Sequence, residues 1–187
     1  HTRFKCDWSS DVCSSDLPVC LVLGALLGLA GSVAPSSMLR GVAWGLDGTL
    51  LVVAAALLAV HFLRQHQDLV AAGFLVFIAG QTLVVSGSAM SLESSSPLFA
   101  AGAALWAAAL LLISAPKVMP TLARASGTLA AMLFAATSVQ IFAGRAVTPL
   151  SEPLPFLAYP VFVLTLLSWA WGCTQSAPRE SRQKVPP

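Results

Sequence analysis

The feature that most constrains this chain is a succession of long apolar runs separated by short polar turns. Six runs can be delimited, at residues 18–34, 41–63, 69–88, 97–115, 125–144 and 156–173. About 20 apolar residues in one helix are enough to cross the roughly 30 Å hydrocarbon core of a bilayer. The pattern therefore predicts an all-α fold, a polytopic transmembrane helix bundle of six spans over residues 18–173.

The composition supports a membrane location, because 57% of the residues are hydrophobic and only 10% are charged. A typical soluble domain has about 25% charged residues. The net charge is +2, and the basic residues are scattered between apolar runs, so we expect no nucleic-acid partner. The expected partner is the lipid bilayer, and a membrane-protein partner or a homo-oligomer is left open.

The two ends of the chain differ from the apolar region between them. Residues 7–17 resemble the conceptual translation of a short-read sequencing adapter, so residues 1–17 are interpreted as an artefactual, non-native segment that does not pack on the bundle. Residues 174–187 are polar and basic and end in proline. They are predicted to form a disordered cytoplasmic tail.

The first apolar run has two interpretations. It contains Gly24-x-x-x-Gly28, a spacing that lets two membrane helices approach closely. It is also as short as the core of a signal peptide, and Ser32-Val33-Ala34 resembles a cleavage site. A retained helix is favoured, and a signal peptide would leave five spans. In the fourth run, Pro97 is expected at the start of the helix, where its missing N–H costs nothing.

The orientation follows from the Lys and Arg residues between the runs, which are retained on the cytoplasmic side of a membrane. If both ends are inside, the inner segments contain Arg64, Lys117, Arg124, Arg179, Arg182 and Lys184. The outer loops then contain Arg40 and Arg145. We therefore expect a multi-pass protein of a bacterial-type plasma (inner) membrane, with its N- and C-termini in the cytoplasm.

Polar residues at one depth form the candidate site. They lie in the predicted outer half of four different spans: Asp47, Gln81, Thr137, Gln140 and Tyr159. Asp47 is the carboxylate of the predicted spans, and an ionisable group there costs roughly 2.5–3.5 kcal/mol. We expect it to face the bundle, with Gln81 as its first polar neighbour. The cluster either fixes helix packing or forms an outward-opening cavity in which Asp47 binds a proton, cation or amine.

Other kinds of site find little support in the sequence. His61 and His66 lie five positions apart, on different faces of a helix, and with Cys20 and Cys173 they form no zinc-type pattern. No phosphate-binding loop, dinucleotide motif or nucleophile motif is present. We therefore predict no metal, no cofactor and no catalytic residues.

Short strings at residues 73–77, 104–107 and 153–156 are similar to those of small multi-pass bacterial inner-membrane proteins. This resemblance implies a membrane bundle and supplies no activity, cofactor or site residue. The sequence thus predicts a protein that is not an enzyme, a non-catalytic membrane subunit or structural protein. The alternatives are a small proton- or solute-coupled carrier that uses Asp47 and, least favoured, an intramembrane enzyme.

Overall fold

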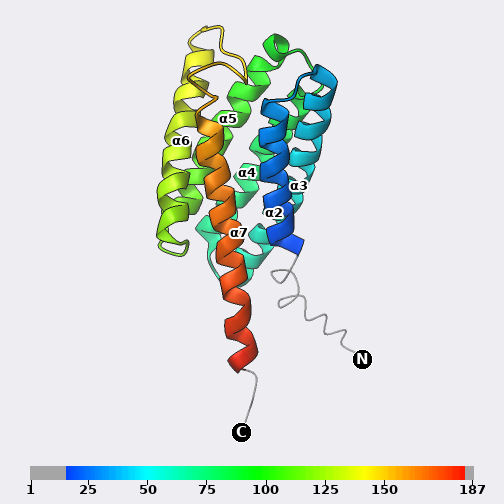
Figure 1. Cartoon of the computed structure of the whole chain (residues 1–187). Helices are drawn as coiled ribbons and strands as arrows, with labels where there is room; N and C mark the ends of the chain where they lie inside the picture. The colour runs from blue at the N-terminus through cyan, green and yellow to red at the C-terminus, as the bar shows by residue number, and fades with distance from the viewer. Residues whose placement is uncertain (1–15, 184–187) are drawn as a thin grey trace, which may run out of the picture.

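Every apolar run of the sequence forms a helix. The computed structural model describes residues 16–183, and this part of the chain contains six helices and no strand (Figure 1). The helices are α2 (Asp16–Ser32), α3 (Ser37–Arg64), α4 (Asp68–Gly87), α5 (Leu92–Ser114), α6 (Thr121–Phe142) and α7 (Ala158–Gln183). The predicted all-α class is confirmed for these residues.

Four of these helices, α3 to α6, are long and apolar enough to cross a membrane. Two further apolar helices are shorter, namely α2 and the part of α7 at residues 158–173. The outside of the bundle carries large exposed apolar side chains, such as Met38, Met132 and Phe142, which are 79%, 58% and 65% exposed. A surface of this kind suits lipid and not water.

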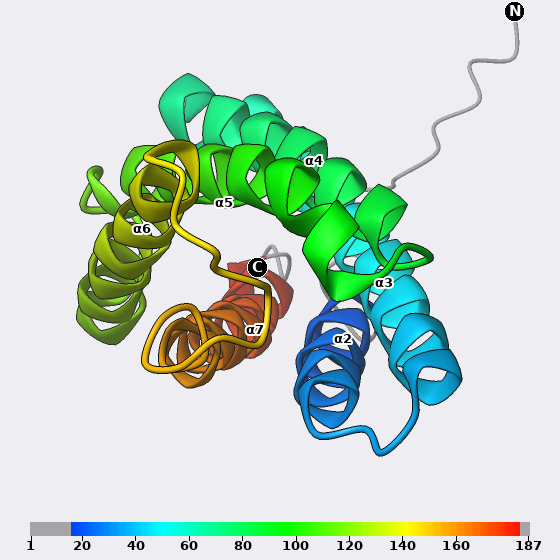
Figure 2. The same cartoon turned by 90° about the horizontal axis from the view of Figure 1, so that it is seen from above.

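The helices follow one another around a ring. Each helix packs against the next one in the chain, from α2 to α7, and α7 also packs against α2. Viewed from above, α7 lies between α6 and α2 and completes the ring (Figure 2). Neighbours in the ring are therefore neighbours in the sequence, apart from the α2–α7 pair.

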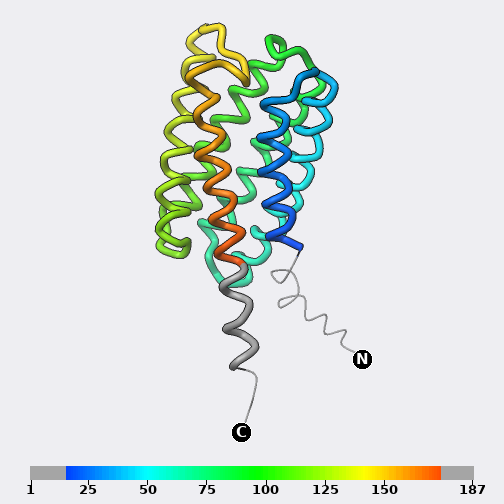
Figure 3. The backbone as a smooth tube through the Cα atoms, in the orientation of Figure 1, coloured from blue at the N-terminus to red at the C-terminus, as the bar shows by residue number. Residues whose placement is uncertain are grey.

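The connections alternate between two ends of the bundle, as the backbone trace shows (Figure 3). We call the end with the α2–α3, α4–α5 and α6–α7 loops the Glu93 end. We call the opposite end, with the α3–α4 and α5–α6 loops, the Lys117 end. Helix α2 begins at the Lys117 end, and α7 runs toward that end from the α6–α7 loop.

The start of α5 differs from the prediction. Pro97 was expected at the helix start, but it lies inside α5, which begins at Leu92. Ser91 is the reason, since its hydroxyl accepts a hydrogen bond from the Ser94 N–H and so caps an earlier turn. Pro97 has no N–H and therefore removes one backbone hydrogen bond near the start of α5. The prediction for Pro97 was wrong because the serines before it favour a helix start.

Helices α3 and α6 end in the same backbone motif. His66 and Gly144 both adopt a positive φ, of 57° and 83°. After α3, the His66 N–H donates to the Leu63 carbonyl, and the Gln67 N–H donates to the Phe62 carbonyl. The corresponding pair of bonds closes α6 around Gly144. These pairs define Schellman motifs, which turn the chain through one left-handed residue.

Aromatic rings fill the interior of the ring of helices. Successive rings contact each other with centroid separations of 5.1–6.3 Å. We call this series the aromatic column; its members are Phe62, Phe74, Trp169, Phe77, Trp106, Phe162, Phe134 and Tyr159. It begins near the Lys117 end at Phe62 and reaches the first turn of α7 at Tyr159.

Two expectations for the chain ends also differ from the structure. Leu17 was placed in a segment that does not pack on the bundle, yet it belongs to α2 and is fully buried in the core. Helix α7 continues to Gln183, into the stretch expected to be a disordered tail. Residues 1–15 and 184–187 lie outside the described part of the chain. Leu21 and Ala25 are buried with Leu17.

Candidate functional site

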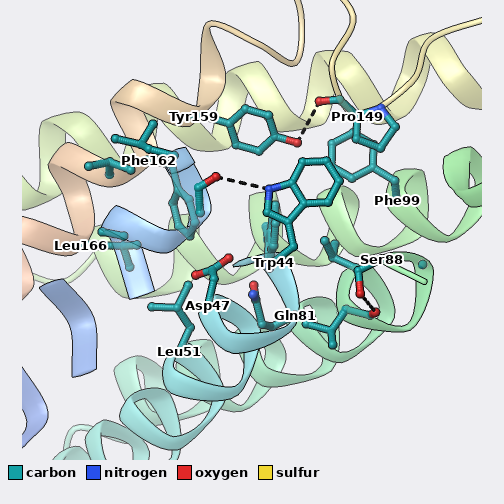
Figure 4. A pocket seen from close by; sticks show the side chains of 18 of the residues that line it. Trp44, Asp47, Leu51, Gln81, Ser88, Phe99, Pro149, Tyr159, Phe162 and Leu166 are labelled. Atoms are coloured by element: carbon teal, nitrogen blue, oxygen red, sulfur yellow. Dashed lines mark hydrogen bonds between the residues drawn. The ribbon is translucent and has the colours of Figure 1, made fainter. Parts of the chain in front are cut away.

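A cavity of about 50 Å³ lies inside the bundle toward the Glu93 end (Figure 4). Its walls come from α2, α3, α4, α5 and α7 and from the α6–α7 loop. A buried water molecule needs a cavity of roughly 10–15 Å³ on the same scale. The cavity thus has room for a few water molecules or for one very small solute.

Asp47 of α3 lies in this cavity against the glycines of α2. A Cβ at Gly28 would lie 3.2 Å from Asp47 Oδ2, and a Cβ at Gly24 would lie 3.5 Å from Asp47 Oδ1. Gly28 therefore makes room for the carboxyl group between two helices, whereas Gly24 makes room mainly for Leu51, whose Cδ2 lies 2.8 Å from the Cβ position. Oδ1 of Asp47 is buried and has no hydrogen-bond partner among the described residues.

Gln81 of α4 lines the same cavity and is only 1% exposed. Its Oε1 is also buried without a hydrogen-bond partner in the described part of the chain. Figure 4 shows Gln81 beside Asp47, below the ring of Trp44. The structure thus brings the two predicted neighbours to one cavity, but Gln81 does not donate a hydrogen bond to Oδ1 of Asp47.

Trp106 also lines the cavity, and its buried indole N–H is a third polar group without a partner among residues 16–183. Burying a polar group without a hydrogen bond costs about 1–3 kcal/mol, so native proteins nearly always satisfy such groups through protein, water or a ligand. Three of these groups around one cavity, two acceptors and one donor, indicate a polar occupant.

Trp44 and Tyr159 lie on the Glu93 side of the cavity. The Trp44 indole donates to the Gly28 carbonyl at 3.3 Å, and the Tyr159 hydroxyl donates to the Pro149 carbonyl at 3.0 Å. The Trp44 ring also lies on Gly31, where a Cβ would overlap it. These contacts hold two aromatic side chains between the carboxyl group and the loops.

Rings of the aromatic column close the opposite side. Trp106 and Phe162 line the cavity, and their rings stack with centroids 5.4 Å apart. The Phe77 ring contacts both of them on the side away from the cavity. Its centroid lies 6.3 Å from that of Trp106 and 5.9 Å from that of Phe162. Toward the Lys117 end the cavity therefore meets packed rings.

The remaining two members of the predicted cluster do not line the cavity. Thr137 is fully buried and donates to the Leu133 carbonyl of its own helix. The Gln140 side chain accepts a hydrogen bond from Arg145 at 3.5 Å near the Glu93 end. The structure thus brings together Asp47, Gln81 and Tyr159 and leaves Thr137 and Gln140 on α6 with other partners.

The aromatic walls of this site were not predicted from the sequence. Trp44 precedes Asp47 by three positions, and residues three apart lie on the same face of a helix. That spacing was a readable signal for Trp44. Trp106 and Phe162 had no comparable signal, because their helices are apolar on every face.

A second polar group of side chains lies toward the Lys117 end. The Thr165 hydroxyl of α7 donates to the Ser126 hydroxyl of α6 at 3.0 Å. The Arg124 guanidinium donates to the Ser114 carbonyl at the end of α5 at 2.9 Å, where a positive charge stabilises the helix terminus. These contacts join α5, α6 and α7. Within residues 16–183, no group of three or more His, Cys, Asp or Glu side chains is arranged to hold a metal ion.

Comparisons with known proteins give no relative from which a role could be transferred. No protein-family model matches the chain, no curated protein sequence matches it, and no solved structure matches it. The function is therefore inferred from the cavity and from the bundle around it.

Proposed function

We propose that this protein is a non-catalytic integral membrane protein with a subunit or structural role. It crosses a bacterial-type plasma membrane six times, with both ends in the cytoplasm. The four long apolar helices support the membrane location. Helix α2 and the apolar part of α7, which are shorter, belong to helices that adjoin each other and long apolar helices in the ring, which supports counting them as spans.

The proposed orientation rests on charge. The loops and chain ends at the Lys117 end carry most of the basic residues, and short basic segments stay on the cytoplasmic side. The Glu93 end then faces outward, and the Asp47 cavity lies in the outer half of the membrane.

The observation that favours a structural role over a carrier is the aromatic column. Between the cavity and Phe62 the interior is filled by rings in van der Waals contact. A carrier has to expose its site to both sides in turn, and moving this many packed rings would disrupt the core of the bundle. The arrangement supports a protein that holds its shape in the membrane.

A second candidate is a small proton- or solute-coupled carrier that uses Asp47. One specific observation favours it, namely that Asp47 Oδ1 accepts no hydrogen bond within the described part of the chain. A carboxylate that served only to join helices would be expected to have a protein donor, since hydrocarbon provides none.

Reconstitution separates the two candidates. The full chain and its Asp47→Asn variant are placed in liposomes loaded with a pH-sensitive dye, and proton uptake and methylammonium uptake are measured. A non-catalytic structural protein gives no flux above that of empty liposomes. Flux in the native protein that disappears in Asp47→Asn would contradict the structural role and establish the carrier.

A further inference from the structure

We propose that the Asp47 cavity is a binding site for a small primary alkylammonium ion, of the size of methylammonium or ethylammonium. The site lies within the protein whose membrane role is proposed above, and it rests on that proposal only for the side of the membrane from which the ion enters.

The unsatisfied acceptor atoms of the wall require an occupant with hydrogen-bond donors. Asp47 Oδ1 and Gln81 Oε1 are both acceptors, so an occupant that satisfies both must carry at least two donors. The Trp106 N–H is itself a donor, and it would need a water molecule bound beside the ion. A primary ammonium group has three N–H donors and a positive charge, and hydrogen bonds between charged partners are roughly twice as strong as neutral ones. Asp47 would supply the opposite charge and Gln81 the second acceptor.

The aromatic rings of the cavity wall favour a cation as the occupant. Trp44, Phe99, Trp106, Tyr159 and Phe162 all line the cavity. The faces of aromatic rings attract cations, and such an interaction is stronger when water is excluded. The apolar part of an alkylammonium ion would contact these rings, while an alkali metal ion would lose most of its water ligands without replacement.

The volume of the cavity and the number of its oxygen atoms favour a short alkylammonium ion over a divalent metal ion. A volume of about 50 Å³ admits a few water-sized groups, which matches a short alkylammonium ion. Calcium requires about six to eight oxygen ligands. The cavity wall provides one carboxyl group, one amide oxygen and three hydroxyl groups, which already donate to backbone carbonyls, from Ser88, Ser95 and Tyr159. These oxygens barely reach the lower limit of what calcium requires and the rest of the wall is mainly apolar, so a divalent metal is a poor fit.

Arg40 is a cationic side chain near the site, and it could compete with an incoming ion for Asp47. Its guanidinium carbon lies 6.0 Å from the centroid of the Trp44 ring, and its Nη2 donates to the Ala34 carbonyl. Arg40 is thus attached to the end of α2 and is not one of the residues lining the cavity. The carboxyl group of Asp47 remains available to an incoming ion.

The test measures binding of radiolabelled methylammonium to the purified full chain in detergent, where both ends are accessible. Binding to Asp47→Asn should be weaker by about tenfold to a hundredfold, because a charge-assisted hydrogen bond is lost. Binding to Gln81→Leu should be weaker by about two- to tenfold. The matched control is Glu93→Gln, which removes an exposed carboxylate at the same end of the bundle but outside the cavity.

A series of competing ions keeps the proposal testable even if Asp47→Asn does not fold. Methylammonium, dimethylammonium, trimethylammonium and tetramethylammonium have successively fewer N–H donors and larger volumes. Their affinity for the native protein should fall in that order, and sodium and potassium should not compete at equal concentration.

Several results would overturn the proposal. They are the lack of saturable methylammonium binding to the native protein, equal binding to folded Asp47→Asn, equal competition by tetramethylammonium or sodium, and an equal loss in Glu93→Gln. Failure to bind leaves the proposed structural role intact, because that role is tested by ion flux. Binding without flux supports both proposals together.

Discussion

A side chain on Gly48 would occupy the space that Val85 fills. A Cβ built at Gly48 would overlap Cγ2 of Val85 and would lie 3.3 Å from Nε2 of Gln81. Helices α3 and α4 therefore approach each other beside the cavity because residue 48 has no side chain. Gly45, one turn earlier in α3, has no neighbouring atom within 4 Å of its Cβ position.

These two glycines predict opposite effects for the same substitution. Gly48→Ala should lower the free energy of unfolding by about 1–3 kcal/mol, because it overpacks the α3–α4 contact. Gly45→Ala should raise it by up to about 1 kcal/mol, since alanine favours helix and nothing obstructs it. Thermal unfolding in detergent, followed by size-exclusion of the remaining monodisperse protein, measures both. If Gly48→Ala and Gly45→Ala changed the free energy of unfolding equally, the close contact between Gly48 and Val85 would be contradicted.

The two Schellman motifs give a second matched pair. A non-glycine residue in the left-handed conformation is strained by roughly 1–2 kcal/mol, and glycine loses about 0.5–1 kcal/mol of that advantage through chain entropy. His66→Gly should therefore stabilise the protein by up to about 1 kcal/mol, and Gly144→Ala should destabilise it by about 1 kcal/mol. The same unfolding assay applies. A loss of stability in His66→Gly would mean that the imidazole makes a contact worth more than the strain.

Gln81 and Ser138 are both buried, but only Ser138 has a partner on another helix. Its hydroxyl donates to the Ala100 carbonyl at 2.8 Å. Ser138→Ala should destabilise the bundle by about 0.6 kcal/mol and by no more than about 1.7 kcal/mol. Gln81→Leu should be neutral or stabilising, because it removes an unsatisfied amide oxygen. If Gln81→Leu costs more than Ser138→Ala, the amide is already satisfied in the ligand-free protein.

The orientation can be checked by labelling. Single cysteines are introduced as Glu93→Cys and Lys117→Cys in a background that lacks the native cysteines, and intact cells are treated with an impermeant maleimide. We expect labelling at position 93 and none at position 117 until the membrane is permeabilised, because basic loops remain inside. Labelling at position 117 alone in intact cells would reverse the proposed topology.

The helices were predictable and the site only partly so, for one physical reason. Apolar runs and the rise of about 1.5 Å per residue fix where a helix lies and how deep each side chain is. They predicted one level for Asp47 and Gln81, and both residues line the cavity. They do not fix the rotation of a helix when all its faces are apolar, and so Thr137 and Gln140 of α6 do not line the cavity.

The order of helices around the ring has a consequence for biosynthesis. Five of the six contacts between neighbouring helices join segments that are adjacent in the chain, so each can form as soon as the next helix has left the ribosome. The contact between α2 and α7 needs the whole chain, and α7 also supplies Tyr159 and Phe162 to the cavity. The wall of the cavity that α7 contributes therefore forms last, after the helices that carry Asp47 and Gln81 have already come together.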